Sequence, residues 1–134
     1  MTMPSIKAIE ARLDVANVAR SAGFYADMLG FDIGTLSPDE SPQFAILSRD
    51  GLRLQLSRRA GASAPASPPA CTLWLDVAGV RDLHSAIKEK VSIEWGPEVY
   101  FYRRREFAFK DPDGHLVILS EVTDDPPTCE EGGG

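Results

Sequence analysis

The hexapeptide LDVANV at residues 13–18 returns almost unchanged as LDVAGV at residues 75–80. Each copy leads into a helix-like segment, RSAGFYADMLGF in the first half and RDLHSAIKEK in the second. Each half then closes on a similar strand-like segment, GLRLQLSR in the first and GHLVILSE in the second. The copies are offset by 62 residues at the start of the repeat and by 63 at its end. A self-match at both ends of a unit indicates one supersecondary module used twice.

The hydrophobic pattern of the first half predicts a βαβββ module over residues 6–58. Strands are expected at residues 6–15, 31–36, 43–48 and 52–57, the last two joined as a hairpin through Asp50-Gly51. The helix is expected to begin after Asn17, a favourable N-cap, and to end at Gly30. Its expected apolar stripe consists of Val18, Ala22, Tyr25 and Met28 or Leu29.

The second half predicts the same module over residues 71–122. Strands are expected at residues 72–77, near 92–94, and at 106–110 and 116–121, with a helix over 80–90 and a DPDG turn before the last strand. Residues 59–70 are small and proline-rich, which predicts a linker between the modules. Residues 1–122 are therefore expected to form a single α+β domain, followed at 123–134 by a flexible tail with nothing to pack against.

The two faces of the predicted sheets differ in chemistry. One face carries apolar side chains that a helix can cover, namely Leu13, Val15, Leu54, Leu56, Leu73, Leu75, Val117 and Leu119. The other carries a mixed set, namely Glu10, Arg12, Asp14, Arg53, Gln55, Ser57, Thr72, Trp74, Asp76, Leu116, Ile118 and Ser120. This set either faces water or lines a cavity around which the two modules curl. The large aromatic Trp74 in mid-strand favours the cavity.

Composition narrows the class of protein. The chain has 134 residues, 43% of them hydrophobic and 25% charged, as expected for one soluble globular domain. A formal net charge of −6 argues against a nucleic-acid partner. We expect no membrane segment and no secretion signal, and two cysteines in unlike contexts form no disulfide framework, so the expected compartment is the cytoplasm. The acidic balance serves either solubility alone or the attraction of cationic small molecules.

The segments RSAGFYADMLGFDIG and REFAFKDPDGHLVILSE together resemble the vicinal oxygen chelate superfamily. This group includes glyoxalase I, extradiol dioxygenases, fosfomycin-modifying enzymes and the bleomycin resistance proteins. The resemblance spans nearly all of residues 6–122. It implies two βαβββ modules per chain and a homodimer with sites built between modules. It does not fix the reaction, because one scaffold hosts many functions.

The resemblance also implies four positions at which the metal enzymes of the superfamily place ligands. In this chain they fall at Glu10 and Gln55 in the first module and at Thr72 and Ile118 in the second. Only Glu10 is a strong ligand, Gln55 is a weak one and Ile118 cannot bind a metal, which falls short of a catalytic divalent site. We therefore expect no metal and no other cofactor, and the sequence leans against an enzyme.

The second half is most similar to the bleomycin resistance branch. That pattern has a tryptophan on the fifth strand, a Gly-hydrophobic-x-x-Leu helix start, and Gly-Arg-Glu-Phe before Asp-Pro-x-Gly. Trp74, GVRDL and RREFAFKDPDG occupy these places here, with Arg104 in place of the glycine. The resemblance implies binding of a small, flat, cationic molecule without chemistry.

Flat rings stack on aromatic faces and cations prefer acidic surroundings, which selects the candidate ligand-binding residues. They are Trp74, Trp95, Tyr100 and Tyr102 for stacking, Glu10, Asp14 and Asp76 for charge, and Gln55 beside them. Other interpretations stay open. The Tyr100–Tyr102 stretch could serve the core or a dimer interface, Arg105 and Glu106 could form a structural ion pair, and Phe107 and Phe109 are expected in the core.

The sequence thus predicts a cytoplasmic homodimer that sequesters a small molecule, as in bleomycin-type antibiotic resistance. One alternative is a metal-dependent lyase, isomerase or dioxygenase of the glyoxalase type, with Glu10 and Gln55 as partial ligands. Another is a catalytically silent regulatory or self-immunity protein that recognises another protein.

Overall fold

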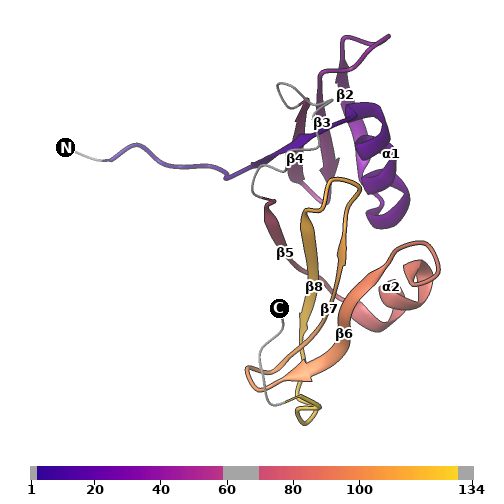
Figure 1. Ribbon diagram of the computed structural model, residues 1–134. Coiled ribbons are helices and arrows are strands. Elements are labelled where there is room, and N and C mark those ends of the chain that lie inside the picture. Colours follow the sequence, from indigo (N-terminus) through magenta and orange to yellow (C-terminus); the bar gives the residue numbers. More distant parts are fainter. Residues whose placement is uncertain (1–2, 59–69, 130–134) are drawn as a thin grey trace. The chain divides into compact units, whose positions relative to one another are not determined.

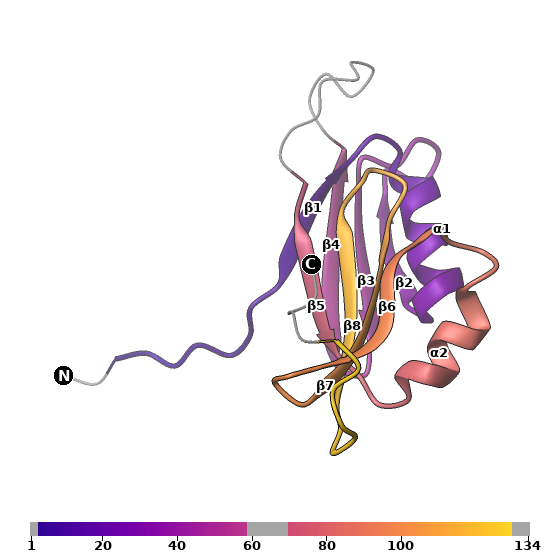
Figure 2. The same cartoon turned by 60° about the horizontal axis from the view of Figure 1, so that its bottom comes forward.

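Each half of the chain folds into a four-stranded mixed sheet with one helix packed on one face (Figures 1 and 2). The computed structural model describes residues 3–58 and 70–129. The first unit consists of β1 (Ala11–Val15), α1 (Val18–Leu29), β2 (Asp32–Ser37), β3 (Phe44–Arg49) and β4 (Leu52–Arg58). The second consists of β5 (Thr72–Asp76), α2 (Val80–Ile87), β6 (Ile93–Tyr100), β7 (Arg104–Lys110) and β8 (Leu116–Val122). Neither helix is long and apolar enough to cross a membrane, as judged over these residues.

The two units share one topology. The strand order is β1-β4-β3-β2 in the first sheet and β5-β8-β7-β6 in the second. In each sheet the first and last strands of the unit pair in parallel, and the remaining pairs are antiparallel. This confirms the predicted α+β fold of two βαβββ modules. The chain divides into two compact units, one from each half. The predicted cavity shared by the modules stays a prediction.

The core of the first unit lies between α1 and the covered face of its sheet. The Asn17 side chain accepts a hydrogen bond from the Arg20 backbone N–H at 2.9 Å, which satisfies an otherwise unpaired donor of the first turn. Gly30 ends the helix with a φ of 70°. Both predicted ends of the helix are confirmed. The buried apolar residues are Leu13, Val15, Val18, Ala22, Tyr25, Leu29, Ala45, Leu47, Leu54 and Leu56.

The second unit repeats this arrangement with larger side chains. Phe107 and Phe109 are fully buried, as expected, and the His84 ring of α2 packs edge-on against Phe107. Val80, Ile87, Val117 and Leu119 complete this core. Leu73 and Leu75 of the edge strand β5 are only half-buried.

Two boundaries differ from the sequence-based expectation. The first strand begins at Ala11 rather than at residue 6, and Ile6 and Ile9 are 86% and 93% exposed. Pairing with β4 begins at Ala11, opposite Leu54, and in the same register residues 6–8 would lie opposite residues 49–51, which precede β4. Residues 3–10 instead run away from the sheet as an extended arm (Figure 1).

The second difference concerns the C-terminal segment. Residues 123–129 were expected to have nothing to pack against, but their backbone binds the second sheet. The Thr123 N–H donates to the Arg103 carbonyl at 3.0 Å, and the Thr128 N–H donates to the Val99 carbonyl at 2.8 Å. Residues 59–69 of the predicted linker at 59–70, and residues 130–134, lie outside the described residues.

Strand β6 is longer than predicted and contains the closest backbone approach at any described glycine. The β6–β7 register shifts between Trp95 and Glu98, with Gly96 at a φ of 81° inside the irregular stretch. A Cβ at Gly96 would lie 2.2 Å from the carbonyl oxygen of Glu106 on β7. Only glycine therefore allows the two strands to meet at this point.

Candidate functional site

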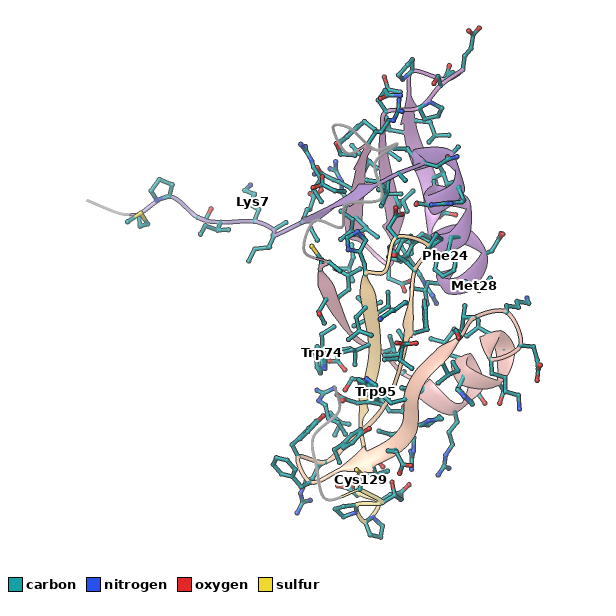
Figure 3. The ribbon with its side chains drawn as sticks, in the orientation of Figure 1. Lys7, Phe24, Met28, Trp74, Trp95 and Cys129 are labelled. Carbon is teal, nitrogen blue, oxygen red and sulfur yellow. The ribbon has the colours of Figure 1, made fainter. Side chains whose placement is uncertain are left out.

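The face of the second sheet opposite α2 carries Trp74 and Trp95, both labelled in Figure 3, and ring contacts join Tyr100 and Tyr102 to them. Trp74 on β5 lies in one cross-strand row with Ile118, Ala108 and Trp95. The Tyr100 ring packs edge-on against Trp95 at a centroid distance of 5.9 Å and stacks on Tyr102 at 5.8 Å. The sheet register and the ring contacts thus bring the four rings together. That they bind a ligand stays a prediction.

At the centre of this face lies Glu106, which sequence reasoning did not select as a site residue. The Trp74 Nε1–H donates to Glu106 Oε2 at 3.1 Å, and the Tyr102 hydroxyl donates to Glu106 Oε1 at 2.6 Å. The residue is only 2% exposed. Over the described residues, no Arg, Lys or His forms an ion pair with its carboxylate. Two aromatic donors therefore hold a buried acidic group that has no ion-pair partner among the described residues.

The hypothesis of an ion pair between Arg105 and Glu106 is wrong. Successive side chains of a strand point to opposite faces, so these two residues of β7 are separated by the sheet itself. Arg105 points to the side of α2, where it forms ion pairs with Asp125 and, at 3.7 Å, with Glu121. The alternation around Phe107 and Phe109 was the signal that could have placed Glu106 beside Trp74.

Asp76 belongs to the same face but is already paired. Arg104 Nη1 donates to Asp76 Oδ1 at 3.0 Å and to Ser120 Oγ at 3.3 Å. The Arg104 guanidinium lies over the Trp74 ring at 4.6 Å from its centroid. The face thus holds one buried acid, one ion pair and four aromatic rings.

Burial raises the pKa of Tyr100 from 10.0 to about 12, with nearby acidic groups, Cys129 first, adding to the shift. Between pH 10 and 12 the folded chain keeps this proton while the unfolded chain loses it, so the stabilisation is complete below pH 10 and is lost as the pH rises to 12. Over this pH range, we expect the free energy of unfolding of the wild type to fall by about 2–3 kcal/mol more than that of Tyr100→Phe. Urea unfolding at pH 9.5 and 12 measures the difference. Equal losses in the two proteins would contradict the assignment.

The first unit gathers a different set on the equivalent face. The Gln55 Nε2–H donates to Glu10 Oε1 at 3.0 Å, and the Arg12 Nε–H donates to Gln55 Oε1 at 3.0 Å. Arg53 forms an ion pair with Glu10 at 3.4 Å. Asp14 lies on the same face of β1, opposite Ser57 in the register, and is exposed. Glu10 and Gln55 are therefore together, as expected, inside a hydrogen-bonded network with two guanidinium groups.

These donors do not fit a divalent cation. Glu10 Oε1 is engaged by Arg53 and Gln55 and the Gln55 amide oxygen by Arg12, so a cation here would meet two positive guanidinium groups. The equivalent positions of the second unit are Thr72 and Ile118, and an isoleucine offers no ligand atom. In the described parts of the chain, no three His, Cys, Asp or Glu side chains come together as a metal-binding group.

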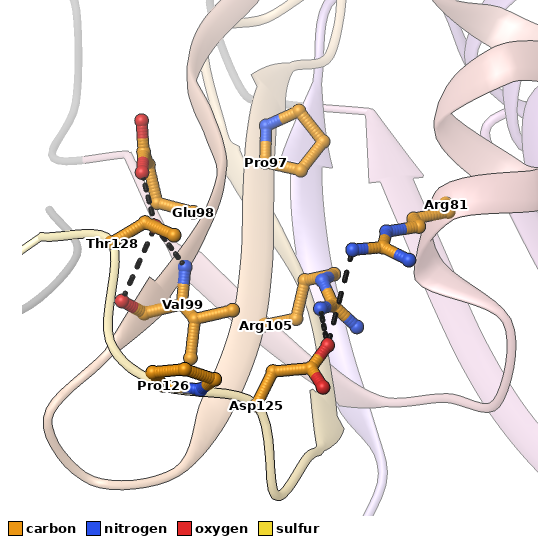
Figure 4. A pocket seen from close by; sticks show the side chains of 8 residues that line it. All are labelled: Arg81, Pro97, Glu98, Val99, Arg105, Asp125, Pro126 and Thr128. Atoms are coloured by element: carbon orange, nitrogen blue, oxygen red, sulfur yellow. Dashed lines mark hydrogen bonds and ion pairs between the residues drawn. The ribbon is translucent and has the colours of Figure 1, made fainter.

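A cavity of about 320 Å³ lies on the other side of the second sheet, between α2, β6, β7 and the C-terminal segment (Figure 4). Asp125 fills its polar end by pairing with Arg105, and Arg81 lies 3.9 Å from the same carboxylate. The hydrogen bond and charge of Arg105 hold the pKa of Asp125 below its usual range. The aromatic rings on the opposite face do not line this cavity, so it is separate from the candidate site.

The candidate residues thus form two groups. Trp74, Trp95, Tyr100, Tyr102 and Asp76 lie together on the second sheet, whereas Glu10, Gln55 and Asp14 lie on the first. That one ligand contacts both groups stays a prediction. The group on the second sheet lies within one unit and has exposed ring surface, with Trp74 47% and Tyr102 40% exposed, around one buried carboxylate.

Solved structures with the same fold include the bleomycin resistance determinant encoded on the transposon Tn5. It is 21% identical, with a TM-score of 0.70 and coverage of 87% of this chain and 98% of that one. A virulence protein from Salmonella typhimurium is 22% identical, with a TM-score of 0.69 over 90% of this chain and 100% of that one. A glyoxalase/bleomycin resistance protein/dioxygenase from Nocardioides is 16% identical, with a TM-score of 0.68 over 98% of this chain and 93% of that one.

At these identities the structural matches show the fold alone. No curated protein matches the chain significantly in sequence. The sequence profile that does match covers residues 8–119, and thus both sheets from β1 to the middle of β8. The chain belongs to the Glyoxalase/Bleomycin resistance protein/Dioxygenase superfamily.

Proposed function

We propose that this protein binds and sequesters a small, flat, cationic molecule without transforming it, as a bleomycin resistance protein does. The observation that carries the proposal is the buried Glu106 carboxylate, held by Trp74 and Tyr102 and without an ion-pair partner among the described residues. A buried acid without a cation disfavours the free protein and favours a ligand that supplies the positive charge.

The aromatic groups match the flat part of such a ligand. Trp74 is 47% exposed and Tyr102 is 40% exposed, so both present ring surface to solvent beside the acid. Each stacked contact contributes about 0.5–1.5 kcal/mol beyond the buried area. Hydrogen bonds from the two rings to Glu106 fix their orientation before a ligand arrives, which lowers the entropic cost of binding.

Sequestration is favoured over catalysis by the donor set. Glu10 and Gln55 are occupied by arginine side chains, and the equivalent residues of the second unit offer no strong ligand. We propose further that the chain acts as a cytoplasmic homodimer and that resistance to an antibiotic of this shape is its role. The resemblance of Trp74, GVRDL and RREFAFKDPDG to the bleomycin resistance pattern supports both.

Replacing Trp74 with alanine should weaken the binding of copper-loaded bleomycin about tenfold to a hundredfold, because stacking area and an orienting hydrogen bond are both lost. Trp74→Phe keeps an aromatic ring but not the N–H, and should lose less affinity than Trp74→Ala. Titration calorimetry on metal-stripped protein measures both, with circular dichroism as the check on folding.

Tight, saturable binding by the wild type with loss in Trp74→Ala would support sequestration at this face. Stoichiometric binding of Ni²⁺, Zn²⁺, Mn²⁺ or Fe²⁺ without drug binding would contradict the proposal and favour a metal enzyme. Unfolding of Trp74→Ala would show that the ring is structural.

A further inference from the structure

The side chain of Arg104 places a positive charge where a bound cation would be expected. Its guanidinium lies 4.6 Å from the Trp74 ring centroid, which is the geometry of a cation–π contact. Two anchors fix it there, Asp76 at 3.0 Å and Ser120 at 3.3 Å. The side chain is 21% exposed, so it forms part of the face and does not extend freely into water.

This cation competes with a ligand in two ways. The negative potential of the Trp74 ring is already used by one guanidinium, and a second positive group brought to the same ring is repelled by the first. A neutral ring that stacks on Trp74 meets no such repulsion. Asp76 offsets part of the charge, but its side chain is 63% exposed and therefore largely screened by water.

We infer that Arg104 is a built-in competitor for the cation site at Trp74 and determines which charge the aromatic face accepts. The inference rests on the proposed function, because it concerns the specificity of the same face. It assigns to Arg104 the role of a specificity-determining residue, which weakens the binding of flat cations relative to neutral molecules of the same shape.

A matched pair of probes isolates the charge. N-methylquinolinium and quinoline at pH 8 share a flat bicyclic ring, and only the first carries a positive charge. Arg104→Gln should bind N-methylquinolinium about three- to thirtyfold more tightly than the wild type does, while binding of quinoline changes less than about twofold. Quenching of tryptophan fluorescence follows both titrations.

Arg103→Gln is the matched control, since it removes one positive charge from the adjacent position. Arg103 is 77% exposed and pairs with Asp124 at 3.8 Å, away from Trp74. It should bind both probes as the wild type does. Arg104→Met is a second neutral variant, to be used if the glutamine variant does not fold.

The outcomes separate the inference from the function. If the wild type binds the probes and the Arg104 variants gain nothing over Arg103→Gln for the cation, the inference is overturned and the proposed function stands. If Arg103→Gln gains as much as Arg104→Gln, net charge explains the effect and the inference also fails. If no protein binds either probe at millimolar concentration, both proposals are overturned.

Discussion

Replacing Gly96 with alanine is expected to destabilise the protein by about 2–5 kcal/mol. An L-residue at a φ of 81° costs about 1–2 kcal/mol, and the added methyl group is overpacked at a cost of about 1–3 kcal/mol. The methyl carbon would lie 2.2 Å from the Glu106 carbonyl oxygen and 2.8 Å from the Phe107 Cα, both backbone atoms that cannot rotate away. Urea unfolding at neutral pH measures the free energy.

Gly23→Ala is the matched control for this substitution. Gly23 lies within α1 and has no positive φ, and a Cβ added there would meet no atom within 4 Å apart from its chain neighbours and the adjacent helix backbone. Alanine there should stabilise the protein by about 0.5–1 kcal/mol through helix propensity. A Gly96→Ala protein that unfolds at the wild-type midpoint would show that β6 does not approach β7 as described.

Replacing Glu106 with glutamine is expected to weaken the binding of N-methylquinolinium by about 30- to 150-fold. The amide keeps the shape of the acid, because its oxygen can accept from Trp74 and its nitrogen can donate to the Tyr102 hydroxyl oxygen. The negative charge disappears. A cation about 5 Å away, at an effective dielectric constant near 20, then loses about 3 kcal/mol of electrostatic attraction. Quinoline binding should change little.

Glu94→Gln tests whether the effect belongs to the site. It also removes one acidic charge, from β6, where Glu94 pairs with Lys110 at 3.4 Å. We expect it to bind both probes as the wild type does. If Glu106→Gln loses no more affinity for the cation than Glu94→Gln, then Glu106 is a structural residue and the ligand is not held by its charge.

The sequence predicts the fold well because the signals involved are local. Asn17 and Gly30 mark the helix ends through their own backbone preferences, and Asp50-Gly51 forms its turn with φ values of 53° and 79°. The internal repeat then transfers each assignment from one half to the other.

The site is predicted less completely because it depends on pairing across strands. Glu106 stands next to Arg105 in the chain, which suggested an ion pair, yet its partners come from β5 and from the turn after β6. Ile9 continues the alternation of β1, yet it is exposed, because β1 pairs with β4 only from Ala11 onward. Both errors concern how far two strands pair or which face a strand presents, and one strand's sequence does not contain that information.

The two copies of the first strand can also be compared face by face. The side chains of the first strand that face the helix stay apolar in both copies, with Leu13 matched by Leu75 and Val15 by Val77. On the other face Asp14 and Asp76 are identical, whereas Arg12 is matched by Trp74 and Glu10 by Thr72. One short strand thus keeps its apolar face while part of its other face changes chemistry. A tandem copy of a βαβββ unit can acquire a new recognition surface while the residues that fold it stay apolar.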